Sequence, residues 1–235
     1  MTSELSIQAL FVSPNSAATC IAIIAHRHHV PEQEVGNLFR VTPASRQSLS
    51  LTLVRHGESN WNVSRLVQGQ DDRAQLTPEG RAQSQLLVES LRAQEFHHLI
   101  SSDLRRARET ASILDVTLKL ATVNEPLLRE RSFGVLEGGP LANLTSDVTG
   151  IDHGVVVDPD ARPARGESFR DVVRRAELFV ERAHAEWPDG PLLVVTHGGM
   201  IRALRAYCAH APLEGLTWDP VGNLSVWTVD ASEPH

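Results

Sequence analysis

The sequence contains few cysteines and no long apolar run. Its two cysteines, Cys20 and Cys208, belong to no CxxC pair. They offer neither a disulfide framework nor a zinc or redox pair, so a reducing compartment is the simpler expectation. We expect no signal peptide, because no basic segment precedes an apolar one at the N-terminus, and residues 17–25 are too short an apolar run to cross a bilayer. These features predict a cytoplasmic protein that does not bind membranes.

Basic charge and internal repeats are also scarce. The chain has 22 Lys and Arg against 29 Asp and Glu, a formal net charge of −7. A dedicated nucleic-acid-binding protein normally has a basic face, so we expect no nucleic-acid partner. A small anionic substrate is not excluded, because a few arginines can dominate the field of one pocket. The length of 235 residues and the 41% hydrophobic content are typical of one globular core with a small extension.

The first 48 residues lack the regular pattern of apolar and amphipathic segments that begins at residue 49. We interpret them as an N-terminal extension to a main domain at residues 49–235. Within the extension, residues 6–13 could form a strand and residues 15–29 a helix. Its apolar side chains need burial against the chain's own core or a second subunit, so a homodimer is one expectation. The histidines of residues 25–29 have no partner cluster, and we interpret them as a helix end without a catalytic role.

From residue 49 onward, apolar runs typical of buried strands alternate with amphipathic segments typical of helices. Thr77 and Pro78 mark one helix start as N-cap and first helical residue. The predicted strands are residues 49–57, 96–102, 191–199 and 223–229, and the predicted helices are residues 76–94, 103–118, 168–187 and 200–211. This alternation predicts an α/β protein with a mostly parallel sheet covered on both faces, a three-layer α/β/α sandwich.

Two predicted strands end in histidine followed by glycine. Residues 55–57 read Arg-His-Gly and residues 196–199 read Thr-His-Gly-Gly. Open parallel sheets bind ligands beyond the carboxyl ends of their strands, so both histidines should lie at that rim. Glycines allow close backbone approach, and amides at a helix start favour an anion. Arginine forks match phosphate oxygens, and no cluster of carboxylates or cysteines suggests a metal. The pattern indicates phosphoryl chemistry with histidine as nucleophile.

Five segments carry a resemblance to a known family. They are LVRHGESNWN (53–62), SSDLRRARETA (101–111), LLRERSFGVLEG (127–138), RGES (165–168) and VVTHGGMIRAL (194–204). In this order they resemble the histidine phosphatase superfamily, branch 1, whose fold is called phosphoglycerate mutase-like. RHG alone is a weak signal, whereas the whole ordered set is specific.

The resemblance implies a role for each matching residue. His56 would be the nucleophile that becomes a phosphohistidine, with its other ring nitrogen held by a backbone carbonyl. Arg55, Arg106 and His197 would bind the phosphoryl oxygens. Glu130 would protonate the leaving oxygen and then activate water. The motif SSDL-x-RA selects Arg106 rather than Arg105, which lies beside it.

Substrate-binding residues follow from the same motifs. They are Ser59, Asn62, Gln68, Gly69 and Gly198, with Asn62 expected to donate from its side-chain amide. Ser59 and Asn62 could instead cap the turn that follows the first motif. The mechanism needs no metal and no cofactor, since arginines supply the positive charge. The one partner expected at the site is a small phosphorylated substrate.

The family contains phosphatases and mutases, and fold does not decide between them. Mutases carry a long basic insertion after the glutamate loop, whereas residues 136–165 are short and acidic in the middle. This favours a phosphomonoesterase, with a cofactor-dependent mutase as the alternative and a non-catalytic phospho-ligand module as a third, weaker hypothesis. Arg165 replaces a glycine of the family's GGES pattern and could add a cation. Sugar phosphates, phosphoglycerates, nucleotide-derived phosphates and ribazole phosphate stay open as substrates.

Overall fold

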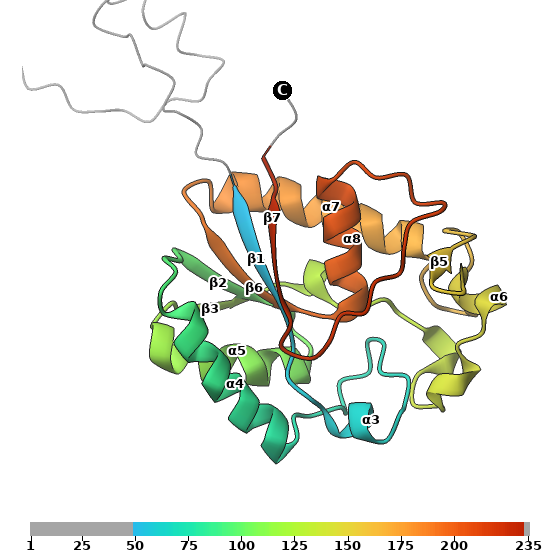
Figure 1. Cartoon of the computed structure of the whole chain (residues 1–235), viewed down its shortest axis with the longest axis horizontal. Coiled ribbons are helices and arrows are strands. Elements are labelled where there is room, and N and C mark those ends of the chain that lie inside the picture. Colours follow the sequence, from blue (N-terminus) through green and yellow to red (C-terminus); the bar gives the residue numbers. More distant parts are fainter. Residues whose placement is uncertain (1–48, 233–235) are drawn as a thin grey trace, which may run out of the picture. The chain divides into compact units, whose positions relative to one another are not determined.

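The computed structural model describes residues 49–232, so the strand, the helix and the histidine cluster predicted before residue 49 lie outside the described residues. Its main sheet has the strand order β3 (Thr122–Asn124), β2 (His98–Ser101), β6 (Leu192–Thr196), β1 (Ser50–Arg55), β7 (Val226–Asp230) (Figure 1). The strands β3, β2, β6 and β1 are parallel, and β7 pairs antiparallel with β1. This confirms the predicted mostly parallel sheet.

Two pairs of helices cover the two faces of the sheet. Helices α7 (Phe169–Glu186) and α8 (Gly198–Cys208) lie on one face, and α4 (Pro78–Leu91) and α5 (Arg105–Leu118) lie on the other (Figure 1). Strand β6 is buried along its whole length. Leu192 and Val194 belong to the core under α7 and α8, and Leu193 and Val195 belong to the core under α4 and α5. A continuous apolar run of this kind is the signature of a strand buried on both faces. The predicted three-layer sandwich is therefore confirmed.

Helix starts follow local chemistry. Thr77 Oγ1 accepts the Gly80 amide at 2.9 Å, as the Thr-Pro sequence predicts for α4. Ser168 caps α7 in the same way, with Asp171 completing a capping box. Helix α8 begins at Gly198, two residues earlier than predicted, so that His197 is its N-cap residue. The first free amides of α8 therefore lie directly beside His197.

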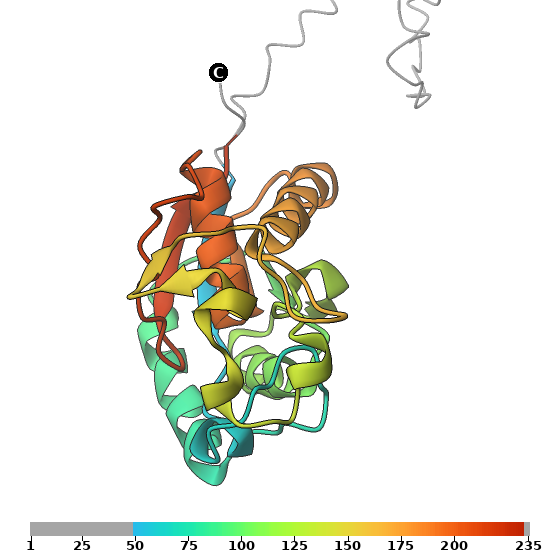
Figure 2. The same ribbon diagram turned by 90° about the vertical axis from the view of Figure 1, so that its right-hand side faces the viewer.

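Residues 125–166, for which the sequence predicts no helix or strand, contain several short elements. Three 3₁₀ turns span Pro126–Leu128, Gly134–Leu136 and Leu141–Asn143, followed by α6 (Ser146–Thr149) and the hairpin of β4 (Ile151–Asp152) and β5 (Val155–Val156). The hairpin lies on the α8 side, where the Val156 amide donates to the Leu216 carbonyl (Figure 2). The sequence also did not predict α3 (Asn60–Val63) or β3. Elements of two to four residues are too short for hydrophobic periodicity to show.

None of the helices within residues 49–232 combines the length and the apolar character that crossing a bilayer requires.

Candidate active site

A cavity of about 370 Å³ opens at the carboxyl ends of β1 and β6. Most of the predicted site residues line it: Arg55, His56, Asn62, Gln68, Gly69, Arg106, Glu130 and Gly198. The two that do not are His197, which is buried behind the cavity surface, and Ser59. The site therefore lies at the strand-end rim where the sequence places it.

The two histidines are brought together by strand register. Arg55 of β1 pairs with Thr196 of β6, so the next residue of each strand is a histidine. The His56 amide donates to the Thr196 carbonyl at 2.9 Å. The ring centroids of His56 and His197 are 5.2 Å apart, and both side chains are buried. Neighbouring parallel strands thus deliver both imidazoles to one point.

His56 is held as a neutral imidazole with an unprotonated Nε2. Its Nδ1 lies 2.8 Å from the Gly57 carbonyl. Because a carbonyl only accepts, Nδ1 carries the proton and Nε2 carries the lone pair. Burial lowers the pKa of His56 well below its ordinary 6.5, and the charges of Arg106 and Arg55 lower it further. The carbonyl contact expected from the family motif is present.

In His197 the two ring nitrogens exchange partners: Nε2 has a hydrogen-bond partner, and Nδ1 has none among the described residues. Its Nε2 lies 2.8 Å from Ser102 Oγ, which accepts the Leu104 amide at 3.3 Å. The buried Ser102 hydroxyl has no other acceptor among the described residues, so hydrogen-bond satisfaction assigns its proton to His197 Nε2. The imidazole proton then lies on Nδ1, a buried atom with no partner in residues 49–232. An unpaired buried donor is matched to an anionic oxygen of a ligand.

Two arginines supply positive charge at the same point. Arg106 is fully buried, with Nε 3.3 Å from His56 Nε2 and Nη2 donating to the Gly69 carbonyl at 2.8 Å. Burial lowers the pKa of Arg106 to about 10, so it stays charged at neutral pH. Arg55 donates to the Val221 carbonyl, but its buried Nε has no partner in the described part of the chain. The unpaired buried nitrogens of Arg55 and His197 thus belong to one site.

Glu130 reaches the start of α8. Its Oε2 accepts the Gly199 amide at 3.1 Å, and its Oε1 accepts the Arg131 amide at 2.7 Å. A Cβ on residue 199 would overlap with Glu130 Oε1, so glycine is required for this approach. The carboxylate therefore faces the cavity beside the first turn of α8.

The structure separates the roles of Ser59 and Asn62. Ser59, predicted as a substrate-binding residue, is fully buried and is not among the residues that line the cavity. It forms a capping box with Asn62 at the start of α3, the other interpretation that the sequence allowed. Asn62 Oδ1 accepts the Ser59 amide at 3.0 Å. Since the oxygen is used in the cap, the Asn62 amide nitrogen is left for the cavity.

The rim loop that contains Gln68 and Gly69 is tied to the site. Gln68 Oε1 accepts the Ser59 hydroxyl, and the Gly69 carbonyl accepts Arg106. Gly69 has a φ of +48°, and a Cβ there would overlap with the Glu137 carboxylate. Two arginines weighed from the sequence, Arg105 and Arg165, do not line the cavity.

Apolar residues form another part of the lining. They are Trp61, Leu66, Val67, Phe133, Leu141 and Leu144. From the acidic stretch at residues 136–165, only these last two leucines reach the cavity. None of the aspartates of that stretch lines it. The cavity thus has a cationic floor and a largely uncharged wall.

Comparison with known proteins identifies the family. The model of the histidine phosphatase superfamily, branch 1, matches residues 51–234. The chain belongs to this superfamily. A protein named probable phosphoglycerate mutase GpmB, from Yersinia enterocolitica, is 35% identical over 195 residues, which cover 79% of this chain and 86% of that protein.

Solved structures of phosphatases are also similar. A mycobacterial glucosyl-3-phosphoglycerate phosphatase in complex with VO3 is 32% identical, with a TM-score of 0.66 over 77% of this chain and 92% of that one. A putative alpha-ribazole-5'-P phosphatase from Escherichia coli is 26% identical, with a TM-score of 0.61 over 71% and 82% of the two chains. The chain is thus an enzyme of the histidine phosphatase superfamily with a phosphoglycerate mutase-like fold.

Sequence reasoning missed three residues of this histidine phosphatase. Ser102 fixes His197, as described above. Asn223 Nδ2 donates to the backbone carbonyls of His56 and Gly57, at 3.0 and 3.2 Å, and so holds the loop that carries His56. Arg202 lines the cavity from α8. A signal for Arg202 was present, because it stands four residues after Gly198 and so shares its helix face.

Proposed function

We propose that the protein is a metal-independent phosphomonoesterase that hydrolyses a small phosphorylated metabolite through a phosphohistidine on His56. The observation that carries the proposal is the neutral His56, whose Nε2 lone pair faces Arg106 at the cavity floor. A nucleophilic nitrogen beside a fixed cation is suited to attack an anionic phosphoryl group.

In the first step, His56 Nε2 forms a bond to phosphorus as the bond from phosphorus to the ester oxygen breaks. Arg55, Arg106 and the Nδ1–H of His197 hold the phosphoryl oxygens and stabilise the charge on them. Each such donor contributes roughly a hundredfold in rate. A proton from Glu130 neutralises the leaving alkoxide, which departs as an alcohol.

In the second step, the Glu130 carboxylate takes a proton from water. The oxygen of that water bonds to phosphorus while the bond from phosphorus to Nε2 breaks. Inorganic phosphate leaves, and His56 returns as the neutral imidazole that the Gly57 carbonyl holds. Arginines and hydrogen-bond donors supply all the positive charge, so the sequence of steps uses no metal ion.

A phosphoglycerate mutase-type transfer is the second candidate function, because proteins named probable phosphoglycerate mutase are 35–36% identical to this chain. A mutase needs a second set of cationic residues to bind the other phosphate of its bisphosphate primer. Residues 136–165 add only Leu141 and Leu144 to the cavity and no cation. This favours hydrolysis over transfer.

The test is phosphate release from phosphoglycerates, sugar phosphates, nucleoside monophosphates and an aryl phosphate. We expect release by wild type, in EDTA as well, and none by folded His56→Ala. The matched control is His153→Ala, which removes an exposed histidine outside the cavity and should leave the rate unchanged. Release of phosphate by His56→Ala would mean that another residue is the nucleophile.

Loss of activity in EDTA, with recovery on adding a divalent ion, would contradict the metal-independent mechanism. Isomerised phosphoglycerate without free phosphate would favour the mutase.

A further inference from the structure

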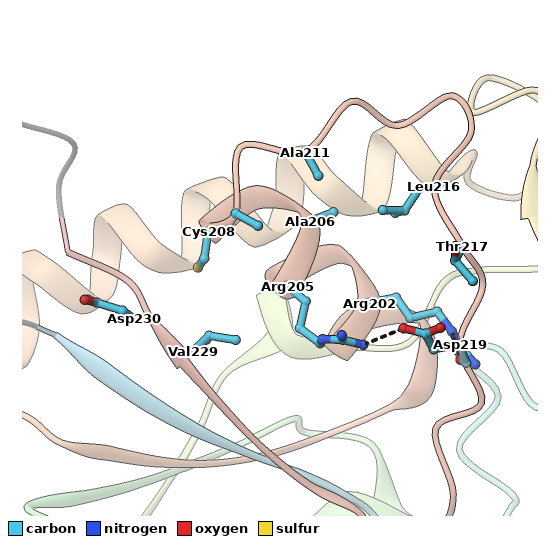
Figure 3. A pocket seen from close by; sticks show the side chains of 11 residues that line it. Arg202, Arg205, Ala206, Cys208, Ala211, Leu216, Thr217, Asp219, Val229 and Asp230 are labelled. Atoms are coloured by element: carbon cyan, nitrogen blue, oxygen red, sulfur yellow. Dashed lines mark hydrogen bonds and ion pairs between the residues drawn. The ribbon is translucent and has the colours of Figure 1, made fainter.

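A second cavity adjoins the active site. It has a volume of about 390 Å³ and lies between α8, residues 211–219 and strand β7 (Figure 3). Arg202 lines both cavities and is therefore part of the wall between them. Cys208 also lines the second cavity, but burial raises the pKa of its thiol to about 11, which leaves it protonated and unreactive.

Arg202 is held in one conformation. Its guanidinium lies 4.4 Å from the centre of the Trp218 ring, and its Nε donates to the Asp219 carbonyl at 2.9 Å. Its two terminal nitrogens have no acceptor among the described residues. Burial lowers the pKa of Arg202 to about 10, which leaves it charged at neutral pH. The stacking and the Nε hydrogen bond thus fix the fork and leave its outer edge open.

The open edge points to the start of α8, next to Glu130. A Cβ added to Gly198 would lie 3.2 Å from Arg202 Nη1, 3.9 Å from Arg55 Nε and 4.0 Å from Glu130 Oε2. Nη1 of Arg202 thus lies close to the backbone of Gly198, and Arg55 and Glu130 lie at ordinary contact distance from the same point. In the proposed mechanism, Glu130 meets the leaving oxygen. Arg202 therefore faces the alcohol part of the substrate.

Among the other arginines that line the cavity, Arg55 keeps an unpaired Nε but holds the phosphoryl oxygens in the proposed mechanism, and the remaining three are committed or exposed. Arg131 donates to four backbone carbonyls, those of Glu167, Thr149, Val148 and Ala161. Arg106 donates to the carbonyls of Gly69 and Asp71, and its Nε meets His56. Arg65 is exposed at the rim. Among the described residues, Arg202 is thus the arginine near Glu130 that the phosphoryl group does not use in the proposed mechanism and whose two terminal nitrogens are both open.

We propose that Arg202 binds a carboxylate on the alcohol part of the substrate. The preferred substrates would then be phosphomonoesters with a carboxylate close to the ester oxygen. A planar guanidinium with two free terminal nitrogens matches one carboxylate in a bidentate way. The uncharged wall of Leu141 and Leu144 offers no further cation for a second phosphate. This inference rests on the proposed function and specifies its substrate class.

Two probes isolate the carboxylate. 3-Phosphoglycerate and glycerol 3-phosphate differ in having a carboxylate or a hydroxymethyl group at the same carbon. Their dissociation constants are measured by calorimetry with His56→Ala, so that turnover does not consume them. We expect 3-phosphoglycerate to bind roughly tenfold or more tightly, as a charge-assisted pair implies.

Two further variants are compared in the His56→Ala background. Arg202→Met should bring the ratio of the two dissociation constants close to one. Arg205→Met is the matched control, because Arg205 is on the same helix, stacks on Trp227 at 4.0 Å, pairs with Asp219 and lines only the second cavity (Figure 3). It should keep the preference. Arg202→Lys retains the charge without the fork and should give an intermediate ratio.

Three results would overturn the inference: no preference in His56→Ala, a preference that survives Arg202→Met, or equal loss in Arg202→Met and Arg205→Met. If Arg202→Met does not fold, the Arg202→Lys ratio decides the question. Hydrolysis by the wild-type enzyme is tested separately. Hydrolysis of both probes without preference would leave the proposed function intact and remove the inference. A carboxylate preference in binding without hydrolysis of any ester would contradict the proposed function and leave Arg202 as a carboxylate-binding residue.

Discussion

Arg106 Nε lies 3.3 Å from His56 Nε2, so a buried cation faces the lone pair that would attack phosphorus. The contact has two consequences. The cation disfavours protonation of His56, and it marks the place where a phosphoryl oxygen must sit between nucleophile and guanidinium. One residue therefore couples the protonation state of His56 to the position of the substrate.

This coupling predicts a shift of the acid limb of the pH–rate profile. In the wild type, kcat/KM should stay flat as pH falls through 6.5, the ordinary histidine value, because His56 has a lowered pKa. Arg106→Met removes a charge that lowers this pKa, so its residual activity should start to fall at higher pH, by about one unit. Arg108→Met, on the exposed side of the same helix, is the control. An unshifted limb in Arg106→Met would contradict the coupling.

Glu130→Gln should slow turnover of alkyl phosphates by about 10²–10⁴-fold, because the leaving alkoxide then receives no proton. An aryl phosphate has a better leaving group, so its first step should be far less affected. Its second step still lacks a base for water. A burst of phenol equal to the enzyme concentration, with phosphate retained on the protein, is therefore expected from rapid-quench measurements. Equal slowing of both ester classes without a burst would argue against this role.

Ser102 is predicted to position His197 without touching substrate. In Ser102→Ala, Nε2 of His197 loses its hydrogen bond, and the imidazole proton is no longer fixed on Nδ1. We expect ¹⁵N chemical shifts of His197 to report the Nδ1–H form in wild type and a mixture in the variant, with kcat reduced about tenfold or more. Ser101→Ala is the matched control: its hydroxyl is equally buried but donates to the Ser102 carbonyl. An Nε2–H form in wild type would refute the assignment.

Arg131 illustrates a stabilising rather than a chemical role beside Glu130. It is buried and donates to the Thr149 carbonyl at the end of α6 and to the Ala161 and Glu167 carbonyls, which follow the hairpin. Arg131→Met leaves those carbonyls unpaired and should lower the free energy of unfolding by about 3 kcal/mol or more. Arg162→Met breaks an exposed ion pair with Asp171 and should cost about 1 kcal/mol or less. Denaturant titration compares the two variants. Equal losses of unfolding free energy would contradict a stabilising role for the buried hydrogen bonds of Arg131.

The sequence predicts the parts of the fold that depend on local pattern and strand ends. The buried run of β6 and the capping residues of α4 indicate their elements directly. The Arg-His-Gly and Thr-His-Gly-Gly segments meet because parallel strand ends share one rim. The sequence leaves the role of Ser59 open, because a motif shows that a residue is present, not whether it caps a turn or contacts a ligand. Arg202 was missed because its role depends on Trp218 and Asp219, which approach it only through the fold.

Acid should destabilise the folded protein through the two buried histidines. Burial lowers the pKa of both His56 and His197 well below 6.5, and the charge of Arg106 lowers both further. The unfolded chain binds protons at these residues below pH 6.5 while the folded chain does not. The free energy of unfolding therefore falls as pH drops below 6.5, and the loss continues down to the folded-state pKa values. Each histidine contributes a slope of up to about 1.4 kcal/mol per pH unit.

Denaturant titrations between pH 7 and pH 5 check this dependence. Most carboxylates titrate below this pH range, so they contribute little to the measured slope. In the double variant His56→Gln and His197→Gln, the unfolding free energy should change less steeply with pH, whatever its absolute value. His153→Ala removes an exposed histidine and should keep the wild-type slope. If the double variant also keeps that slope, the two imidazoles are not the groups that resist protonation in the fold. Their neutrality in the fold is what the phosphohistidine mechanism requires, so kcat/KM should stay flat over this pH range while the free energy of unfolding falls.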